Sequence, residues 1–505
     1  MQVGVWHIVG ILLILVLIAV VGLWSGRRVN NAKDFTTGNG KAGAWLVCGT
    51  IMGSLVGGQA TVGTVQMAFS FGISAWWFTL GAGLGCIVLA IGYVVPLRHS
   101  GDMTLLQIIG EEYGSRAESI ASVLCSVGIF ISVISNVLAF TALLTALFSI
   151  DVYLAAGISV IVMAVYVIFG GVWGTGMGGV TKLILLYIAS LIGFILVLTL
   201  SGGFRGIMNS LCDAVSNNAL GELYGFANRD DVSDYYLNPV ARGAMKDIGS
   251  GLSLIMGVLS TQTYAQAIWS AKSNSKARKG ALLSGFLVPP IGIACILIGF
   301  YMRGHYITSD EISALAAAGQ IIPQGLTEIS SSAQAFPVFI LDHLPPLLGG
   351  AILGTLLLTV AGGGAGLSLG VATILVNDIF YKMKPAAAEG SKGLVLTRVT
   401  LVGILLASAV VASLVPGAII NDFGFLSMGF RGAAVLVPLT CALFFPGRVD
   451  SRWALAAIIL GPLPVLIGNL FELSFDPLFL GVGVSLFLVA IGERYKQYCS
   501  GGNKK

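Results

Sequence analysis

Long apolar segments alternate with short polar ones along almost the whole chain. A transmembrane helix needs about 20 consecutive, mostly apolar residues. Thirteen segments of the 505-residue sequence approach or exceed that length. We predict spans at about residues 4–25, 43–72, 74–97, 119–148, 152–170, 180–201, 248–270, 280–302, 345–380, 394–415, 421–445, 453–471 and 474–492. The pattern therefore predicts an all-α polytopic membrane protein.

One apolar run is too long for a single span and contains a weak point near its middle. Residues 42–97 contain no Asp, Glu, Lys or Arg, and residues 51–63 read I-M-G-S-L-V-G-G-Q-A-T-V-G. Adjacent Gly57 and Gly58 each weaken a helix by about 1 kcal/mol relative to Ala. Carbonyls left unpaired at membrane depth need protein or a watery cavity around them. This stretch is either a discontinuous helix at a solute or ion site or a glycine-rich helix packed closely on its neighbours.

Composition and charge agree with the membrane assignment. The chain is 56% hydrophobic and 10% charged, with a mean hydropathy of +0.92, whereas soluble proteins are about 25% charged. The net charge of +4 gives no support to a nucleic-acid partner. The seven cysteines show no C-x-x-C pairing and the four histidines do not cluster, so we predict no metal site and no cofactor.

The distribution of basic residues predicts how the chain is oriented. With the N-terminus outside, 20 of the 27 Lys and Arg residues fall in the cytoplasm and five fall outside. Lys182 and Arg431 lie within or at spans. This asymmetry supports an odd number of spans in the cytoplasmic membrane, with the C-terminus in the cytoplasm. The apolar run from Val3 to Trp24, followed by Arg27-Arg28, is interpreted as a retained first helix.

Two enzyme-like motifs do not predict an enzyme. The D-D-x-x-D pattern at residues 230–234 is typical of a magnesium–diphosphate site in a membrane transferase, but no second acidic motif faces it from another span. A solvated acidic loop is the simpler interpretation. Residues 38–43 match G-x-G-x-x-G, but no strand precedes them.

Five stretches carry motifs whose order and spacing agree with one known family. They are Asp34-Phe35 with Gly38, residues 104–116 (TLLQIIGEEYGSR), residues 166–173 (YVIFGGVW), residues 261–280, and residues 377–382 (NDIFYK). Together they resemble the sodium:solute symporter family, whose members include proline, pantothenate and sugar transporters. The resemblance implies a secondary transporter that moves a small organic solute by alternating access.

The resemblance also implies a fold and a domain organisation. The fold is of the leucine-transporter type, with two five-helix repeats in inverted orientation. One transmembrane domain, residues 1–505, would hold a first helix at about 4–25, core repeats at about 43–201 and 248–445, and two C-terminal helices at about 453–492. The first helix of each repeat would be broken, at Gly57-Gly58 and near residues 260–264.

The implied solute site lies between the two breaks, near the bilayer midplane. The polar residues expected there are Gln59, Thr61, Gln66, Gln262, Tyr264 and Gln266. Polar side chains at that depth cost energy unless they face the interior of the bundle. For each glutamine, an interhelical hydrogen bond is the alternative interpretation.

The chain departs from the family at the sodium sites. The family's main site uses carbonyls of the broken helix, here near Gly53 and Val56, together with two hydroxyls that fall on Gly362 and Gly363. A further family aspartate falls near Gly179. Three oxygen-bearing side chains are therefore missing.

A small shift of the alignment would instead supply Thr359 or Ser368 as ligands. This is the alternative of an ordinary sodium symporter with a displaced sodium site.

Two cations within the spans suggest how the chain functions without those ligands. Lys182 is predicted to fill the carbonyl-lined hollow in place of sodium, so that transport is proton-coupled or proceeds by exchange. Arg431 is predicted to face the central cavity and to favour an anionic or zwitterionic solute. The alternatives are snorkelling to the interface and, for Arg431, capping of helix carbonyls. A non-coupled facilitator or sensor of the same fold remains a rival function.

Overall fold

The structure is a computed structural model that describes residues 3–26, 40–101, 104–148, 150–168, 171–216, 219–321, 323–383, 391–415, 417–471 and 473–502. The Asp34-Phe35 motif lies outside the described residues.

Helices dominate the first half of the chain. In order they are α1 (Val5–Gly26), α3 (Ala44–Leu55), η2 (Gln59–Gly63), α4 (Thr64–Phe71), η3 (Gly72–Ala75), α5 (Trp76–Val88), η4 (Leu89–Tyr93), α6 (Val94–Ser100), α7 (Leu105–Tyr113), α8 (Ser115–Phe148), α9 (Val152–Ile168) and α10 (Gly171–Leu200). The segments named η are short 3₁₀ or π turns.

Short elements follow before the second set of long helices begins. They are α11 (Phe204–Ser216), α12 (Ala219–Tyr224) and α13 (Arg229–Leu237). The next elements are α14 (Ala244–Leu259), α15 (Gln262–Trp269), α16 (Asn274–His305), β1 (Tyr306–Thr308), α17 (Ser309–Ala317), β2 (Thr327–Ile329), η5 (Ser332–Gln334) and α18 (Ala335–His343). Strands β1 and β2 pair in parallel, with Tyr306 opposite Thr327.

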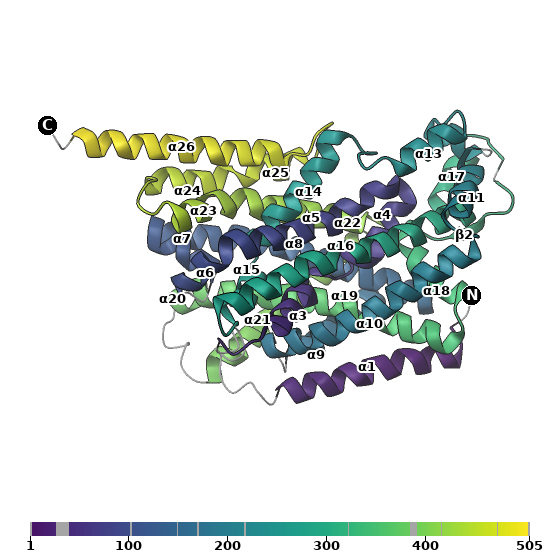
Figure 1. The fold of residues 1–505 in the computed structure, drawn as a ribbon, viewed down its shortest axis with the longest axis horizontal. Helices are drawn as coiled ribbons and strands as arrows, with labels where there is room; N and C mark the ends of the chain where they lie inside the picture. The colour runs from purple at the N-terminus through teal and green to yellow at the C-terminus, as the bar shows by residue number, and fades with distance from the viewer. Residues whose placement is uncertain are drawn as a thin grey trace.

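The remaining elements complete the bundle. They are α19 (Pro346–Ile374), η6 (Leu375–Phe380), α20 (Tyr381–Met383), α21 (Ser391–Leu414), α22 (Ile420–Arg431), η8 (Gly432–Leu436), α23 (Val437–Phe444), α24 (Ser451–Leu460), α25 (Pro462–Gly468) and α26 (Leu478–Gly502). The long helices run side by side along the longest axis of the molecule (Figure 1).

Each predicted span coincides with one helix or with consecutive helical segments. Within the described residues, nine helical runs are long and apolar enough to cross a membrane, and residues 5–17 of α1, 44–55 of α3 and 152–167 of α9 are shorter apolar helical stretches. Large apolar side chains on the outer helices are exposed, for example Leu191 on α10 and Val410 on α21. A hydrocarbon environment would cover these side chains, so the protein is integral to a membrane. The number of spans that cross it stays a prediction.

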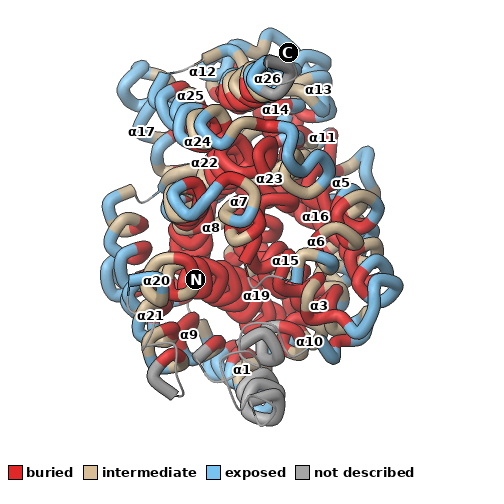
Figure 2. Tube along the Cα trace, turned by 90° about the vertical axis from the view of Figure 1, so that its left-hand side faces the viewer, coloured by how far each residue is buried: buried red, intermediate tan, exposed pale blue. Residues whose placement is uncertain are grey.

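Helix α19 lies in the middle of the buried part of the bundle (Figure 2). Residues 352–374 of this helix are all buried, and α19 packs against α1, α8 and α10. Glycines permit these close contacts. A β-carbon at Gly350 would overlap the backbone of His7 on α1, and one at Gly363 would lie 2.7 Å from the α-carbon of Gly57.

Both predicted helix breaks are confirmed. Helix α3 ends at Leu55 and the helical path resumes at Gln59. Between them Val56 has φ −87° and ψ 84°, which is not helical. Helix α14 ends at Leu259 and α15 begins at Gln262.

The two ends of the bundle carry different connecting elements. Helices α11, α13 and α17 and the N-terminus lie at one end, whereas α7, α20 and the C-terminus lie at the other (Figure 1). We call them the α13 end and the α7 end.

Candidate functional site

The break between α3 and η2 is shaped by a side chain from α8. Asn136 accepts a hydrogen bond from the Gly58 amide at 2.9 Å and donates to the Ser132 carbonyl at 2.9 Å. A β-carbon at Gly57 would overlap Asn136, and one at Gly58 would overlap Ala139. The glycine pair therefore lets α8 approach the broken backbone closely enough for Asn136 to cap it.

The carbonyls exposed by this break accept hydrogen bonds from a lysine. Lys182, on α10, is 1% exposed. Its Nζ donates to the Gly53 and Val56 carbonyls at 2.7 Å each, and to the Thr359 carbonyl of α19 at 3.3 Å. We call these three carbonyls the Lys182 hollow. The ammonium thus joins α10, α19 and the broken helix at one point.

The glycines of α19 leave room for the lysine instead of supplying ligands. A β-carbon at Gly362 would lie 3.5 Å from Lys182 Nζ and 3.2 Å from the Tyr166 hydroxyl. Gly362 thus stands beside the hollow but contributes no side-chain oxygen, whereas Gly363 packs on the break.

The two hydroxyls considered as substitute ligands bond to their own helix. Thr359 Oγ1 donates to the Thr355 carbonyl at 2.7 Å, and Ser368 Oγ donates to the Gly364 carbonyl. Thr359 takes part in the Lys182 hollow through its backbone carbonyl only. Both hydroxyls are thus bonded within α19 in this structure, and the displaced sodium site stays a prediction.

The helix that carries Lys182 lies unusually close to α3. A β-carbon at Gly179 would overlap the Gly49 carbonyl, and one at Gly49 would overlap the Gly176 carbonyl. A side chain at 179 would push the helices apart. The position of the family's aspartate is therefore a helix contact in this protein.

A second buried cation lies on α22. Arg431 is fully buried, and its Nη1 donates to Ser427 Oγ at 3.0 Å. Within the described residues, Arg431 Nε and the Tyr264 hydroxyl have no hydrogen-bond partner. Unpaired buried polar groups cost about 1–3 kcal/mol each, so each of these two groups is suited to a polar ligand.

The remaining predicted solute residues separate into two groups. Gln59 lies against α22, where a β-carbon at Gly424 would sit 3.0 Å from its Nε2, and this nitrogen has no described partner. Thr61 instead donates to the Gly57 carbonyl at 3.0 Å, which stabilises the break. Gln59 therefore remains a candidate solute contact, while Thr61 has a local structural partner.

The other three glutamines bind neighbouring helices. Gln66 accepts from the Ile420 amide at 3.0 Å. Gln262 accepts from the Leu105 amide at 2.9 Å. Gln266 donates to Thr373 Oγ1 at 3.1 Å, although its Oε1 has no described partner. These contacts match the alternative interpretation of interhelical hydrogen bonds.

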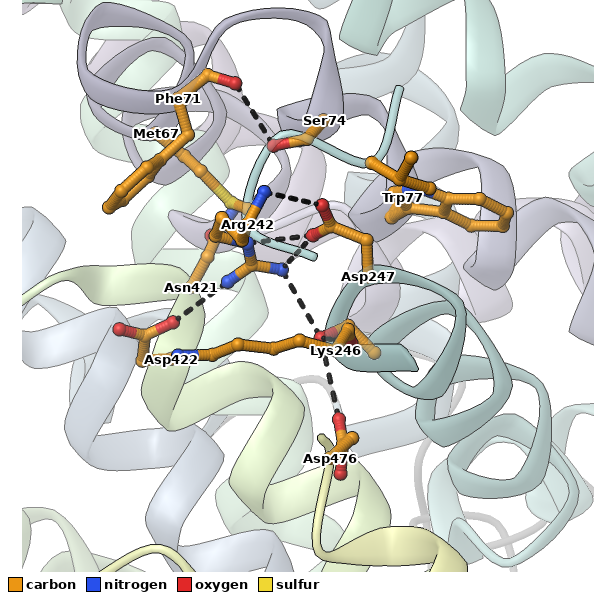
Figure 3. Close-up of polar contacts among 12 residues, drawn as sticks. Met67, Phe71, Ser74, Trp77, Arg242, Lys246, Asp247, Asn421, Asp422 and Asp476 are labelled. Carbon is orange, nitrogen blue, oxygen red and sulfur yellow. Dashed lines mark hydrogen bonds and ion pairs between the residues drawn. The ribbon is translucent and has the colours of Figure 1, made fainter. Parts of the chain in front are cut away.

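An arginine joins several helices at the α13 end. The Arg242 guanidinium donates to Asp247 at 2.7 Å and to Asp422 of α22 at 3.3 Å (Figure 3). Its central carbon lies 5.9 Å from the ring centroid of Phe71 and 5.2 Å from that of Phe425. We call this group the Arg242 cluster. It joins the ends of α4 and α22 to the start of α14.

A second ion pair at this end anchors the connecting helices. Arg303 donates to Glu311 at 2.7 Å and to the Tyr236 hydroxyl, which in turn donates to the Phe69 carbonyl of α4. Burial raises the pKa of Glu311, but the Arg303 guanidinium and its hydrogen-bond donors outweigh this and hold the pKa below its ordinary value. The last turn of α4 is thus fixed from outside the bundle.

A carboxylate closes the α7 end. Asp378, on η6, is fully buried. It accepts from Thr104 Oγ1 at 2.9 Å, from Ser122 Oγ at 3.1 Å and from Gln107 Nε2 at 3.3 Å. These bonds tie the start of α7 to α8 and α19. The same start of α7 is held on α15 by Gln262, which accepts a hydrogen bond from the Leu105 amide.

Several of these residues were not predicted from the sequence. Asn136 is the only amide in the apolar segment 119–148, a signal that could have identified it. Arg242 lies in a polar connection where nothing in the local pattern distinguishes it from Arg229. In the sequence, Asp378 was noted only as part of the family motif at residues 377–382.

Solved structures of transporters share this fold. A Na⁺-coupled sialic acid symporter, solved in a substrate-bound outward-open state, aligns with a TM-score of 0.77 at 16% identity and covers 98% of both chains. A nucleobase-cation-symport-1 family transporter, solved in a closed conformation with bromovinylhydantoin bound, aligns with a TM-score of 0.53 at 12% identity. The chain is therefore a polytopic protein of the leucine-transporter fold, with two inverted five-helix repeats.

Sequence comparison identifies the family. The family model described as "Sodium:solute symporter family" matches residues 35–461, and the chain belongs to this family. It is 23% identical to the high affinity choline transporter 1 of Homo sapiens over 58% of this chain and 50% of that protein. It is 22% identical to the sodium/glucose cotransporter 4 of Danio rerio over 74% of this chain and 58% of that protein. The matches thus span about half the length of these curated relatives.

Proposed function

We propose that this protein is a secondary transporter of a small organic acid or zwitterion that works without a sodium ion in the Lys182 hollow. The observation that carries the proposal is the placement of the Lys182 ammonium on the Gly53, Val56 and Thr359 carbonyls. An ammonium is a compact charge with three donors, so it satisfies carbonyl oxygens much as a small monovalent cation does.

Electrostatic repulsion argues against sodium and the Lys182 ammonium occupying the Lys182 hollow together. Two unit charges 4 Å apart repel by about 4 kcal/mol at an effective dielectric constant of 20. That energy corresponds to a loss of about three powers of ten in sodium affinity. Sodium therefore binds here only if the lysine leaves or loses its proton, which makes a proton or an exchanged solute the better candidate for coupling.

The chemistry of the solute follows from the second buried cation. Within the described residues, Arg431 Nε and the Tyr264 hydroxyl have no hydrogen-bond partner, and Gln59, on η2, presents an unpaired Nε2 to α22. A buried guanidinium with an unpaired donor fits a carboxylate. The names of the two relatives mention choline and glucose. The structurally similar symporter with the TM-score of 0.77 is described as a transporter of sialic acid, which is an acid.

Alternating access would proceed by opening one closed end at a time. At the α13 end, the Arg242 cluster and Gln66 hold α4 against α22. At the α7 end, Asp378 and Gln262 hold α7 against the core. With the N-terminus outside, as the basic residues predict, the α13 end faces outward and the α7 end faces the cytoplasm. Coupling requires that the two closures never open together.

Transport into proteoliposomes tests the proposal. A thermal-shift screen of carboxylic and amino acids first identifies a solute, because binding to the native state stabilises it. Uptake of that solute is then measured under a sodium gradient at equal pH, and under a pH gradient without sodium. We expect no sodium-driven accumulation. Accumulation that disappears when choline replaces sodium would refute the proposal and indicate an ordinary sodium symporter.

The same measurements separate a carrier from the rival functions. A carrier exchanges labelled internal solute for external solute with saturable kinetics, whereas a simple pore shows no counterflow. A sensor would bind the solute in the thermal-shift screen but fail to move it. Either result would contradict secondary transport.

A further inference from the structure

A groove on the membrane-facing surface lies near the α7 end, between the start of α3 and the first turns of α16. Its volume is about 570 Å³, and its walls include Trp45 on one side and Lys276, Lys279, Leu282, Leu283 and Phe286 on the other. Below the groove the helices touch, because a β-carbon at Gly280 would overlap the Val47 side chain. The groove is therefore a surface hollow with a closed floor.

The polarity of the groove changes along α16. Lys276, Lys279, Leu283 and Phe286 recur at three- or four-residue spacing and so share one face of the helix. At 1.5 Å per residue, Lys276 and Phe286 are separated by about 15 Å along the axis. That distance is about half the thickness of the hydrocarbon core. The groove thus extends from the headgroup level into the acyl chains.

Its apolar side chains are open to the surroundings. Trp45 is 62% exposed and Phe286 is 68% exposed. Tryptophan is enriched at the membrane–water interface, so Trp45 marks the headgroup level on the wall opposite the lysines.

No acidic residue in the described part of the chain neutralises the charge of the groove. Lys276 and Lys279 are exposed, and neither forms an ion pair with any residue that the structure describes. The two segments that form the walls, residues 42–97 and 248–309, contain no Asp or Glu. Lys272 and Arg278 add further positive charge nearby. A ligand here meets a basic rim above an apolar wall.

We infer that this groove binds an anionic phospholipid from the leaflet at the α7 end. Its phosphate group would contact Lys276 and Lys279, and one acyl chain would follow Leu283 and Phe286. A free phosphate would leave the apolar wall uncovered, and a neutral lipid would leave the lysine charges without a counter-charge. The complementarity of charge and polarity therefore favours a lipid with a net negative headgroup.

The position of the groove gives the lipid a role in the transport cycle. One wall is the beginning of α3, whose other end supplies the Gly53 and Val56 carbonyls of the Lys182 hollow. A lipid bound across the groove would hold α3 against α16. Anionic lipid would then stabilise the closed α7 end, and this consequence does not depend on the identity of the solute.

Quenching of tryptophan fluorescence by brominated lipids tests the site directly. The full-length protein would be reconstituted with either brominated phosphatidylglycerol or brominated phosphatidylcholine in an unbrominated background. The contribution of Trp45 is the difference between the wild type and Trp45→Phe. We expect that contribution to be quenched at least several-fold more by phosphatidylglycerol, and the preference to weaken as salt is raised.

A matched pair of variants gives the control. The double variant Lys276→Gln/Lys279→Gln should lose the preference for phosphatidylglycerol, whereas Lys272→Gln, in the same connection but outside the groove, should keep it. Equal quenching by the two lipids in the wild type, or an unchanged preference in the double variant, would overturn the assignment. So would thermal stabilisation by glycerol 3-phosphate equal to that by phosphatidylglycerol, since it would indicate a phosphate site without a lipid. A dimer that forms only when the groove is intact would indicate a second copy as the occupant.

Discussion

Replacing Lys182 with alanine should convert the Lys182 hollow into a sodium-binding site. The substitution removes the ammonium that donates to the Gly53 and Val56 carbonyls at 2.7 Å. A buried carbonyl left without a donor costs about 1–3 kcal/mol, so the two carbonyls together cost about 2–6 kcal/mol. The substitution also removes the cost of burying the ammonium away from water, and this gain offsets part of the loss of stability. We expect a folded variant that is destabilised by a few kcal/mol.

Sodium should restore part of that loss in the variant and none of it in the wild type. A ligand at 100 times its Kd stabilises the native state by about 2.7 kcal/mol. In the wild type, the repulsion of about 4 kcal/mol from the ammonium removes this effect at ordinary salt concentrations. The measurement is the unfolding temperature of the purified protein in sodium chloride and in potassium chloride at equal ionic strength. Only the Lys182→Ala variant should have a different unfolding temperature in the two salts.

Two further variants control for general effects of substitution on α10. Thr181→Ala removes a hydroxyl that bonds only to the Met177 carbonyl of its own helix, so it should show no sodium effect. Lys182→Gln retains an amide donor without a charge and should be less destabilised than Lys182→Ala. A sodium-specific rise in the unfolding temperature of the wild type would refute the reasoning, because it would show that sodium and the ammonium do not compete.

Three other substitutions test the break, the solute contact and the closure at the α13 end. Asn136→Ala should lower stability by about 1–3 kcal/mol in thermal unfolding, because the Gly58 amide loses its acceptor; Ser126→Ala, which removes an unpaired hydroxyl from the same helix, should be close to neutral. Arg431→Lys should raise the KM for an acidic solute about tenfold while protein abundance stays normal, since a guanidinium fork is lost; an unchanged KM would place the solute elsewhere. Arg242→Ala should increase labelling of cysteines introduced between α4 and α22 by membrane-impermeant thiol reagents, and unchanged labelling would exclude Arg242 as a closure.

The sequence predicted those parts of the fold that depend on local composition. A span depends on the mean polarity of about 20 consecutive residues, and each predicted span coincides with helix. The break at 57–58 was predictable for the same reason, because adjacent glycines weaken a helix wherever it packs. The break near 260–264 was expected only from the resemblance to the family. Local polarity does not determine how many helices cross the membrane.

The partners of buried polar side chains were less predictable, because they come from distant parts of the chain. Gln66 and its partner Ile420 are 354 positions apart, and Gln262 and Leu105 are 157 positions apart. An isolated amide in an apolar run indicates that some partner exists. It does not indicate whether that partner is a solute or a backbone amide, and for Gln66 and Gln262 the structure shows a backbone amide.

The prediction for Lys182 was more specific because backbone atoms form the hollow. Any residue supplies a carbonyl, and the resemblance to the family placed the carbonyl positions of the broken helix near Gly53 and Val56. The missing hydroxyls at Gly362 and Gly363 then indicated a site without side-chain ligands. The contacts of Lys182 agree with that expectation, while its role in coupling stays a prediction.

The loss of the family's aspartate and the position of the lysine are two aspects of one structural change. Gly179 has no side chain, and for that reason α10 approaches α3 until a β-carbon at 179 would overlap the Gly49 carbonyl. Lys182 lies about one helical turn further along α10 and therefore on nearly the same face. An aspartate at 179 would separate the helices and draw the ammonium away from the Val56 carbonyl. An aspartate at 179 therefore requires α10 and α3 to move apart, whether or not Lys182 is present, because its side chain does not fit while the two helices remain in contact.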